Sequence, residues 1–180
     1  MSNPIEKWFG EEFSNLDPLI QELHLKGGKL SGAVDISYGS GTAGLIGKRL
    51  AKKLGIPTNC NESPLQVSIN HNDTGLLWDR TFGHSHEMKS VFTPHGSFPD
   101  GYWVESSGNI SLFLGVQIID GGWHWVQKRM EFKGVPLPLS IFPKTTAYKT
   151  IVDGRYVFSV SFTLPVLGKL LSYSGRLVPS

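Results

Sequence analysis

The sequence predicts a mainly β domain of the α+β class: a large curved antiparallel sheet or barrel of about eight strands, with two or three helices in the N-terminal half. Apolar and polar residues alternate through most of the chain after Pro64, which is the period of a strand with one buried face. Short turn sequences rich in Gly, Asn and Asp separate these segments, and such connections join antiparallel neighbours. Helical spacing of apolar residues is confined to the first part of the chain.

Residues 1–57 hold the predicted helices and the first strand. Apolar residues at helical spacing predict helix over residues 5–25, divided at Pro18 because proline starts helices but does not continue them. A strand is expected over residues 32–38. A further helix is expected over residues 42–54, where a glycine and a proline follow the last apolar position.

Residues 64–180 are predicted to form the sheet. The clearest inward-facing rows are Ile110-Leu112-Leu114-Val116-Ile118 and Tyr156-Phe158-Val160-Phe162, whose members alternate with residues of the other face. No linker divides the chain, so one domain over residues 1–180 is expected. Strand order stays open, and both a closed barrel and an open sheet gripping the helices fit the pattern. The predicted strands span residues 65–71, 76–82, 86–92, 101–105, 109–119, 123–132, 145–151, 154–163 and 170–178.

Composition excludes several classes of protein. The net charge of +2 is too small to indicate nucleic-acid binding. Cys60 is the single cysteine, so an internal disulfide and a cysteine metal cluster are excluded, and a reducing compartment fits. We see no signal-peptide pattern and no apolar run near the ~20 residues of a membrane span. We expect a soluble, cytoplasmic protein.

The segment Leu76-Leu77-Trp78-Asp79-Arg80-Thr81-Phe82 places one arginine on an apolar strand face. Arg80 shares that face with the rings of Trp78 and Phe82. Removing a guanidinium from water is costly unless it is paired, stacked or lining a polar pocket. Arg80 is therefore the main candidate for a site.

Two interpretations of Arg80 are open. In one, it binds a carboxylate or phosphate while aromatic rings hold an apolar body, which is the usual composition of a small-molecule site. In the other, backbone carbonyls or an acid such as Asp35 or Glu105 satisfy it. The candidate ligand-binding residues are Arg80, Trp78, Phe82, Phe113, Phe158 and Glu105.

Histidines supply the weaker candidates for chemistry. His84 and His86 are two apart on a predicted strand, and with Glu105 or His124 they could approach one metal. The same His84, His86 and His124 are candidate acid–base groups. A mobile hairpin explains the first pair equally well, and we predict no metal site and no cofactor.

The stretch Gly39-Ser40-Gly41-Thr42-Ala43-Gly44 matches GxGxxG between a predicted strand and a predicted helix. A dinucleotide site would need a parallel strand after that helix, and the downstream sequence predicts antiparallel pairing instead. We therefore interpret the glycines as a turn that bends the strand into the helix, although an anion at the helix start is an alternative.

Two surface features suggest partners. Lys48, Arg49, Lys52 and Lys53 lie together on the amphipathic helix, which is typical of a solvated face and also of peripheral contact with an anionic membrane. In Trp123-His124-Trp125 at a hairpin tip, exposed indoles would indicate a partner surface. The alternative packs one ring over the hairpin and the other over the core.

Several spaced motifs occur in one order along nearly the whole chain. They are Gly44-x-x-Gly47-x-x-Leu50-Ala51-x-x-Leu54-Gly55-x-Pro57, Trp78-x-Arg80-x-Phe82, Gly134-Val135-Pro136-Leu137-Pro138 with Pro143, Asp153-Gly154-Arg155-Tyr156-x-Phe158, and Leu164-Pro165-x-x-Gly168-x-Leu170-x-x-Tyr173-x-Gly175-x-Leu177-x-Pro179. Together they resemble the bacterial domain-of-unknown-function family DUF4166. The resemblance implies one domain and carries no catalytic residues. Other members occur fused behind a nicotinamide-dinucleotide-binding, dehydrogenase-like or epimerase-like domain.

Three functions follow as hypotheses. The first is a non-enzymatic domain that binds an apolar or amphipathic small molecule within the curved sheet, with Arg80 at the polar end. The second is an enzyme that acts on such a ligand through the histidines or Glu105. The third, implied by the family's fusions, is a module that docks on a dehydrogenase-like or epimerase-like partner.

Overall fold

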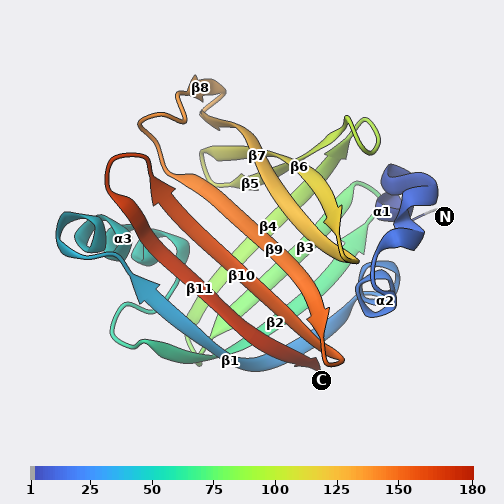
Figure 1. Cartoon of the computed structure of the whole chain (residues 1–180), viewed down its shortest axis with the longest axis horizontal. Helices are drawn as coiled ribbons and strands as arrows, with labels where there is room; N and C mark the ends of the chain where they lie inside the picture. The colour runs from blue at the N-terminus through green and yellow to red at the C-terminus, as the bar shows by residue number, and fades with distance from the viewer. Residues whose placement is uncertain (1–2) are drawn as a thin grey trace.

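A computed structural model describes residues 3–180 and shows a closed antiparallel β-barrel (Figure 1). Ten strands form the barrel, and a short eleventh, β8 (Val135–Leu137), pairs with β7 alone. The barrel strands are β1 (Gly28–Tyr38), β2 (Glu62–Asn72), β3 (Gly75–Phe82), β4 (His86–His95), β5 (Tyr102–Ser107), β6 (Ile110–Ile119), β7 (Gly122–Phe132), β9 (Lys144–Val152), β10 (Arg155–Leu164) and β11 (Gly168–Pro179). The helices are α1 (Pro4–Phe9), the 3-10 helix η1 (Gly10–Asn15), α2 (Pro18–Lys26) and α3 (Gly41–Leu54).

Two pairings of β7 close the sheet. Every strand from β1 to β6 pairs antiparallel with the next one, and β1 also pairs with β11. β11 pairs with β10, and β10 pairs with β9. β7 then pairs with β6 on one side and with β9 on the other, which completes the ring. The mainly β, antiparallel prediction is confirmed, but the strand count of about eight is wrong. Ten strands form the barrel because β1 joins the same sheet and all nine strands predicted after Pro64 pair in it.

The N-terminal helices cover one end of the barrel, which we call the helical end (Figure 1). Trp8 packs edge-on against Trp103, and Phe9 packs against Trp123, so α1 inserts aromatic rings among residues of the strands. Helix over residues 5–25 was expected as α-helix divided at Pro18; the part before Pro18 is an α-helix followed by a 3-10 helix. The buried apolar residues of these helices are Ile5, Trp8, Phe9, Phe13, Leu16, Ile20 and Leu23.

Helix α3 lies at the opposite end, which we call the α3 end, with the β3–β4, β5–β6 and β10–β11 turns and the β7–β9 connection. Gly44 of the GxGxxG stretch, and Gly47 just after it, allow close packing here. A Cβ on Gly47 would stand 1.9 Å from the backbone oxygen of Leu170, and one on Gly44 would stand 2.4 Å from that of Gly39. β2 returns antiparallel to β1, so the parallel unit of a dinucleotide site is not formed.

Charge is segregated between the two ends. At the α3 end, helix α3 and the connections 83–85, 108–109, 133–143 and 165–167 contain five cations and no carboxylate. These cations are Lys48, Arg49, Lys52, Lys53 and Lys133. The strand ends beside them add the cations of Lys144 and Lys169 and the exposed carboxylates of Glu62 and Glu87, so this end keeps an excess of positive charge. The helical end comprises residues 3–27 and the β2–β3, β4–β5, β6–β7 and β9–β10 connections. These segments contain two cations, Lys7 and Lys26, and many more carboxylates. The carboxylates of that end are those of Glu6, Glu11, Glu12, Asp17, Glu22, Asp73, Asp100, Asp120 and Asp153.

Within residues 3–180, no helix combines the length and the apolar character needed to cross a membrane.

Candidate ligand-binding site in the barrel

Arg80 lies on the inner face of β3, as the alternation predicts, and only 8% of its surface is exposed. Its Nη1 donates hydrogen bonds to Ser90 Oγ at 3.1 Å and to Met88 Sδ at 3.2 Å, both on the neighbouring strand β4. The guanidinium carbon lies 5.1 Å from the ring centre of Trp78. Two weak neutral acceptors and one indole therefore surround a permanent positive charge.

Arg80 forms no ion pair with any carboxylate of residues 3–180. Asp35 lies exposed on β1, where it alternates with the buried Val34 and Ile36. Glu105 faces into the barrel, because it pairs with the inward-facing Phe92 and Leu112 positions, and its charge acts on the nearby Tyr173 hydroxyl, but it forms no salt bridge with Arg80. The direct partners are neither backbone carbonyls nor an acid, so the guanidinium has no carboxylate in contact with it, and Glu105 is the acid that shares the interior with it.

Two buried tyrosines share the interior with Arg80. The hydroxyl of Tyr156 on β10 is buried and has no hydrogen-bond partner among the described residues. Burial raises the pKa of Tyr156 and of Tyr173, the charge of Arg80 opposes the rise in both, and the charge of Glu105 adds to the rise in Tyr173. The Tyr173 hydroxyl donates to Met88 Sδ at 3.9 Å, so Met88 contacts both Tyr173 and Arg80. The three polar groups therefore occupy one region of the barrel.

A second buried basic group lies toward the helical end. Lys149 Nζ on β9 is 2.6 Å from His24 Nε2 on α2, and both side chains are almost fully buried. Burial first, and then the charge of Arg80, lowers the pKa of Lys149 well below its usual value. Burial and Lys149 lower the pKa of His24 in the same direction. Two bases in contact cannot both stay protonated at this distance in an apolar interior.

Three indoles surround the Lys149 amine. Its Nζ lies 3.7 Å from the ring centre of Trp123, 4.5 Å from that of Trp78 and 5.7 Å from that of Trp125. Trp123 and Trp125 both face inward, contrary to the expectation that one would pack over the hairpin. Residues two apart on a strand share a face, which explains the result.

Sequence reasoning missed Lys149 and His24. His24 had a visible signal, because it follows Ile20 and Leu23 at helical spacing on the buried face of α2. Lys149 had none, because its neighbours on the same face are Ala147 and Ile151 in a strand of mixed polarity.

The aromatic candidates separate into two groups. Phe82 and Phe158 are buried inside the barrel, and each packs edge-on against Tyr173. Phe113 lies on the outer face, because it alternates with the inward-facing Leu112 and Leu114 positions, and Arg129 stacks over its ring at 3.8 Å. The interior therefore brings Trp78, Phe82 and Phe158 together with Arg80 and leaves Phe113 out.

The candidate acid–base histidines lie away from this interior. His84 and His86 are exposed at the β3–β4 hairpin. His124 is on the outer face of β7, stacked on Tyr148 with ring centres 5.3 Å apart. Burial lowers the pKa of His124 and Asp120 opposes that shift. No group of three metal-ligating side chains occurs among residues 3–180, so the structure does not assemble these histidines with Glu105.

Burial along the inner face is uneven. Trp103, Trp123 and Leu76 near the helical end are fully enclosed. Nearer the α3 end, several residues of the inner face are only partly buried. They are Met88, Leu112, Trp125, Ala147, Val160 and Phe162.

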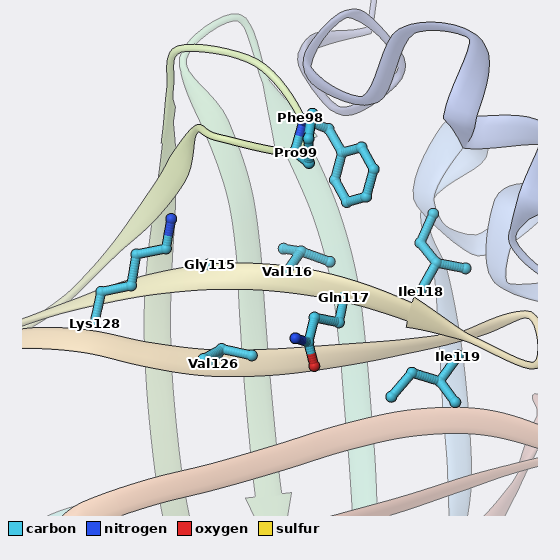
Figure 2. A pocket seen from close by; sticks show the side chains of 9 residues that line it. All are labelled: Phe98, Pro99, Gly115, Val116, Gln117, Ile118, Ile119, Val126 and Lys128. Carbon is cyan, nitrogen blue, oxygen red and sulfur yellow. The ribbon is translucent and has the colours of Figure 1, made fainter.

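A shallow surface hollow of about 610 Å³ lies elsewhere, where the end of β6 has no β5 partner (Figure 2). Figure 2 shows the ring of Phe98 above β6 and the side chain of Lys128 rising toward the connection that carries Phe98. Lys128 Nζ donates to the carbonyl oxygens of Asp100 and Gly101, each at 3.4 Å. The hollow shares no residue with the Arg80 region. Its lining residues are Phe98, Pro99, Gly115, Val116, Gln117, Ile118, Ile119, Val126 and Lys128.

These features define the class of protein: a closed antiparallel β-barrel with a cationic and aromatic interior. The chain belongs to the family described as "Domain of unknown function (DUF4166)", whose model matches residues 16–177. This confirms the resemblance drawn from the spaced motifs. Neither a curated protein nor a solved structure gives a match.

Proposed function

We propose that the barrel binds an amphipathic small molecule through an anionic group, without catalysing a reaction. The observation that carries the proposal is the buried guanidinium of Arg80, which has no carboxylate partner within residues 3–180. A carboxylate or phosphate of the ligand would supply the direct ionic partner that Glu105 does not, in a bidentate arrangement. The unpartnered hydroxyl of Tyr156 would donate one more hydrogen bond to the same anion.

The remainder of the interior suits an apolar body. Aromatic rings dominate it around Arg80, and residues of the inner face toward the α3 end are only partly buried. An apolar lining with a few placed polar groups is the usual composition of a small-molecule site. A fatty acid, an isoprenoid acid or an aromatic acid has this combination of properties.

The test compares a fluorescent fatty acid, cis-parinaric acid, with its uncharged methyl ester. Replacing Arg80 with Met removes the cation and keeps a long apolar side chain. Arg176→Met on the exposed outer face of β11 is the matched control. Loss of a charge-assisted hydrogen bond costs about 1.5–3 kcal/mol, so Arg80→Met is expected to weaken binding of the acid by roughly tenfold to a hundredfold.

The methyl ester and the Arg176→Met control separate charge recognition from simple partitioning. We expect the ester to bind wild type and Arg80→Met equally, and Arg176→Met to bind the acid like wild type. Mass spectrometry of organic extracts should find an amphiphilic acid with wild type and less of it with Arg80→Met. Equal binding of the acid to both proteins, with clean extracts from folded wild type, would refute the proposal.

A further inference from the structure

The most exposed apolar side chains gather at the α3 end of the barrel. Val166 is 92% exposed, Leu45 and Ile141 are each 67% exposed, and Val135 is 61% exposed. Every other large apolar residue among residues 3–180 is less than half exposed. Single exposed apolar residues are ordinary on a protein surface, but four of them at one end of a barrel form a pattern.

These four side chains come from three separate segments. Leu45 is on α3, Val166 is at the tip of the β10–β11 hairpin, and Val135 and Ile141 belong to the connection between β7 and β9. Figure 1 shows α3, that hairpin and β8 together at the end of the barrel opposite α1 and α2. Apolar side chains on separate protruding segments can each enter the interface of a lipid bilayer. They do not form the single continuous apolar surface that a folded protein partner would need.

The α3 end also carries an excess of positive charge. Helix α3 and the β7–β9 connection hold cations and no carboxylate, and cations outnumber carboxylates at this end even with the neighbouring Glu62 and Glu87, whereas the helical end is dominated by carboxylates. A lipid surface with anionic headgroups attracts such a cationic face and repels the acidic one, which orients the molecule before contact. Cations beside inserted apolar residues are the composition of interfacial membrane binding.

We propose that the α3 end docks on the surface of an anionic lipid bilayer, inserting Leu45, Val135, Ile141 and Val166 among the headgroups. The cations of α3, with Lys133 and Lys144 on the β7–β9 side, then face the phosphate layer. This surface goes beyond the proposed function and does not depend on it. It also places the accessible part of the inner face toward the membrane, from which an amphipathic acid could be taken up.

The experiment is co-sedimentation of the purified protein with vesicles of phosphatidylcholine alone or with about 30% phosphatidylserine. Wild type is expected to sediment with the anionic vesicles and much less with the neutral ones, and 0.5 M NaCl should reduce sedimentation. Leu45→Glu/Val166→Glu and Lys48→Glu/Arg49→Glu each change two exposed side chains, so folding should be retained. Each is expected to lower partitioning about tenfold or more.

The matched control places the same change at the helical end. Val152→Glu/Val178→Glu alters two partly exposed valines there, and it should sediment like wild type. Arg80→Met should also sediment like wild type, which keeps this result independent of the ligand-binding test. The proposal is overturned if wild type does not sediment with anionic vesicles, or if the helical-end control loses as much binding as the α3-end variants. It is also overturned if sedimentation equilibrium shows that Leu45, Val135, Ile141 and Val166 instead mediate self-association.

Discussion

Under the proposed function, Arg80 would couple the stability of the protein to recognition of the ligand. Its charge is buried with a hydroxyl, a thioether and an indole as partners, and among residues 3–180 no carboxylate contacts it. A buried charge in such a setting contributes less to stability than a well-packed apolar side chain of similar size. The arrangement makes sense if the counter-ion arrives with a ligand.

We therefore predict that Arg80→Met stabilises the ligand-free protein while weakening acid binding. The expected gain is about 1–2 kcal/mol in the free energy of unfolding, at the lower end of what removal of buried charges gives. Urea denaturation of delipidated protein measures it, with Arg176→Met as the control that should change little. A clear loss of stability in Arg80→Met would show that the charge is already well compensated inside the barrel.

At the scale of single elements, α3 packs closely against the barrel because glycine, which has no side chain, stands at the contact. Gly47 brings the helix so close to β11 that no Cβ fits between them. Ile46, Leu50 and Leu54 then pack beside this contact against the core. Gly47 lies just after the GxGxxG stretch. Within the stretch, Gly44 packs against the backbone oxygen of Gly39 and Gly41 adopts a positive φ of 53°, which fits the interpretation of a turn that bends the strand into the helix.

We predict that Gly47→Ala destabilises the protein by about 2 kcal/mol or more, although alanine favours helix over glycine by about 1 kcal/mol. The reason is overlap with the backbone oxygen of Leu170, which cannot rotate away. Thermal and urea unfolding measure the change, and Lys53→Ala on the exposed side of α3 serves as control. An unchanged or higher melting temperature for Gly47→Ala would mean that α3 shifts freely on the barrel.

Local pattern predicted most elements but not how they join. Alternation around Arg80 correctly placed Trp78, Arg80 and Phe82 on one inner face, because side-chain period is a local property. Closure rests on the pairing of β7 with β9, and long-range pairing leaves no local trace. Val135–Leu137 was missed because two prolines flank or interrupt it. The partnership of Lys149 with His24 spans 125 positions and appears only once the helices cover the barrel end.

For the whole molecule, the Lys149–His24 contact makes stability depend on pH. Folded Lys149 loses its proton at lower pH than the 10.5 of an unfolded lysine. Between these two pKa values the unfolded state binds more protons, so the free energy of unfolding rises with pH. His24, whose folded pKa is below 6.5, adds a rise of the same sign at lower pH.

We predict that wild type gains stability between pH 7 and 9.5 relative to Lys149→Met, by up to about 1.4 kcal/mol per pH unit. Urea melts at several pH values give the two slopes. The window stops below pH 10 because Tyr156 and Tyr173, whose pKa values are raised, reverse the sign where unfolded tyrosine ionises. Parallel slopes for the two proteins would contradict the lowered pKa of Lys149.

Both described ends of the chain, α1 and the last residues of β11, lie at the helical end (Figure 1). A polypeptide joined ahead of α1 or after β11 would therefore extend from the acidic side of the barrel and leave α3 and the β10–β11 hairpin uncovered. Immobilising the protein through either terminus presents the α3 end to the solution. In a protein that carries a further domain at either terminus, that domain would lie beside the helical end. The α3 end of the barrel would then remain free to contact a membrane surface.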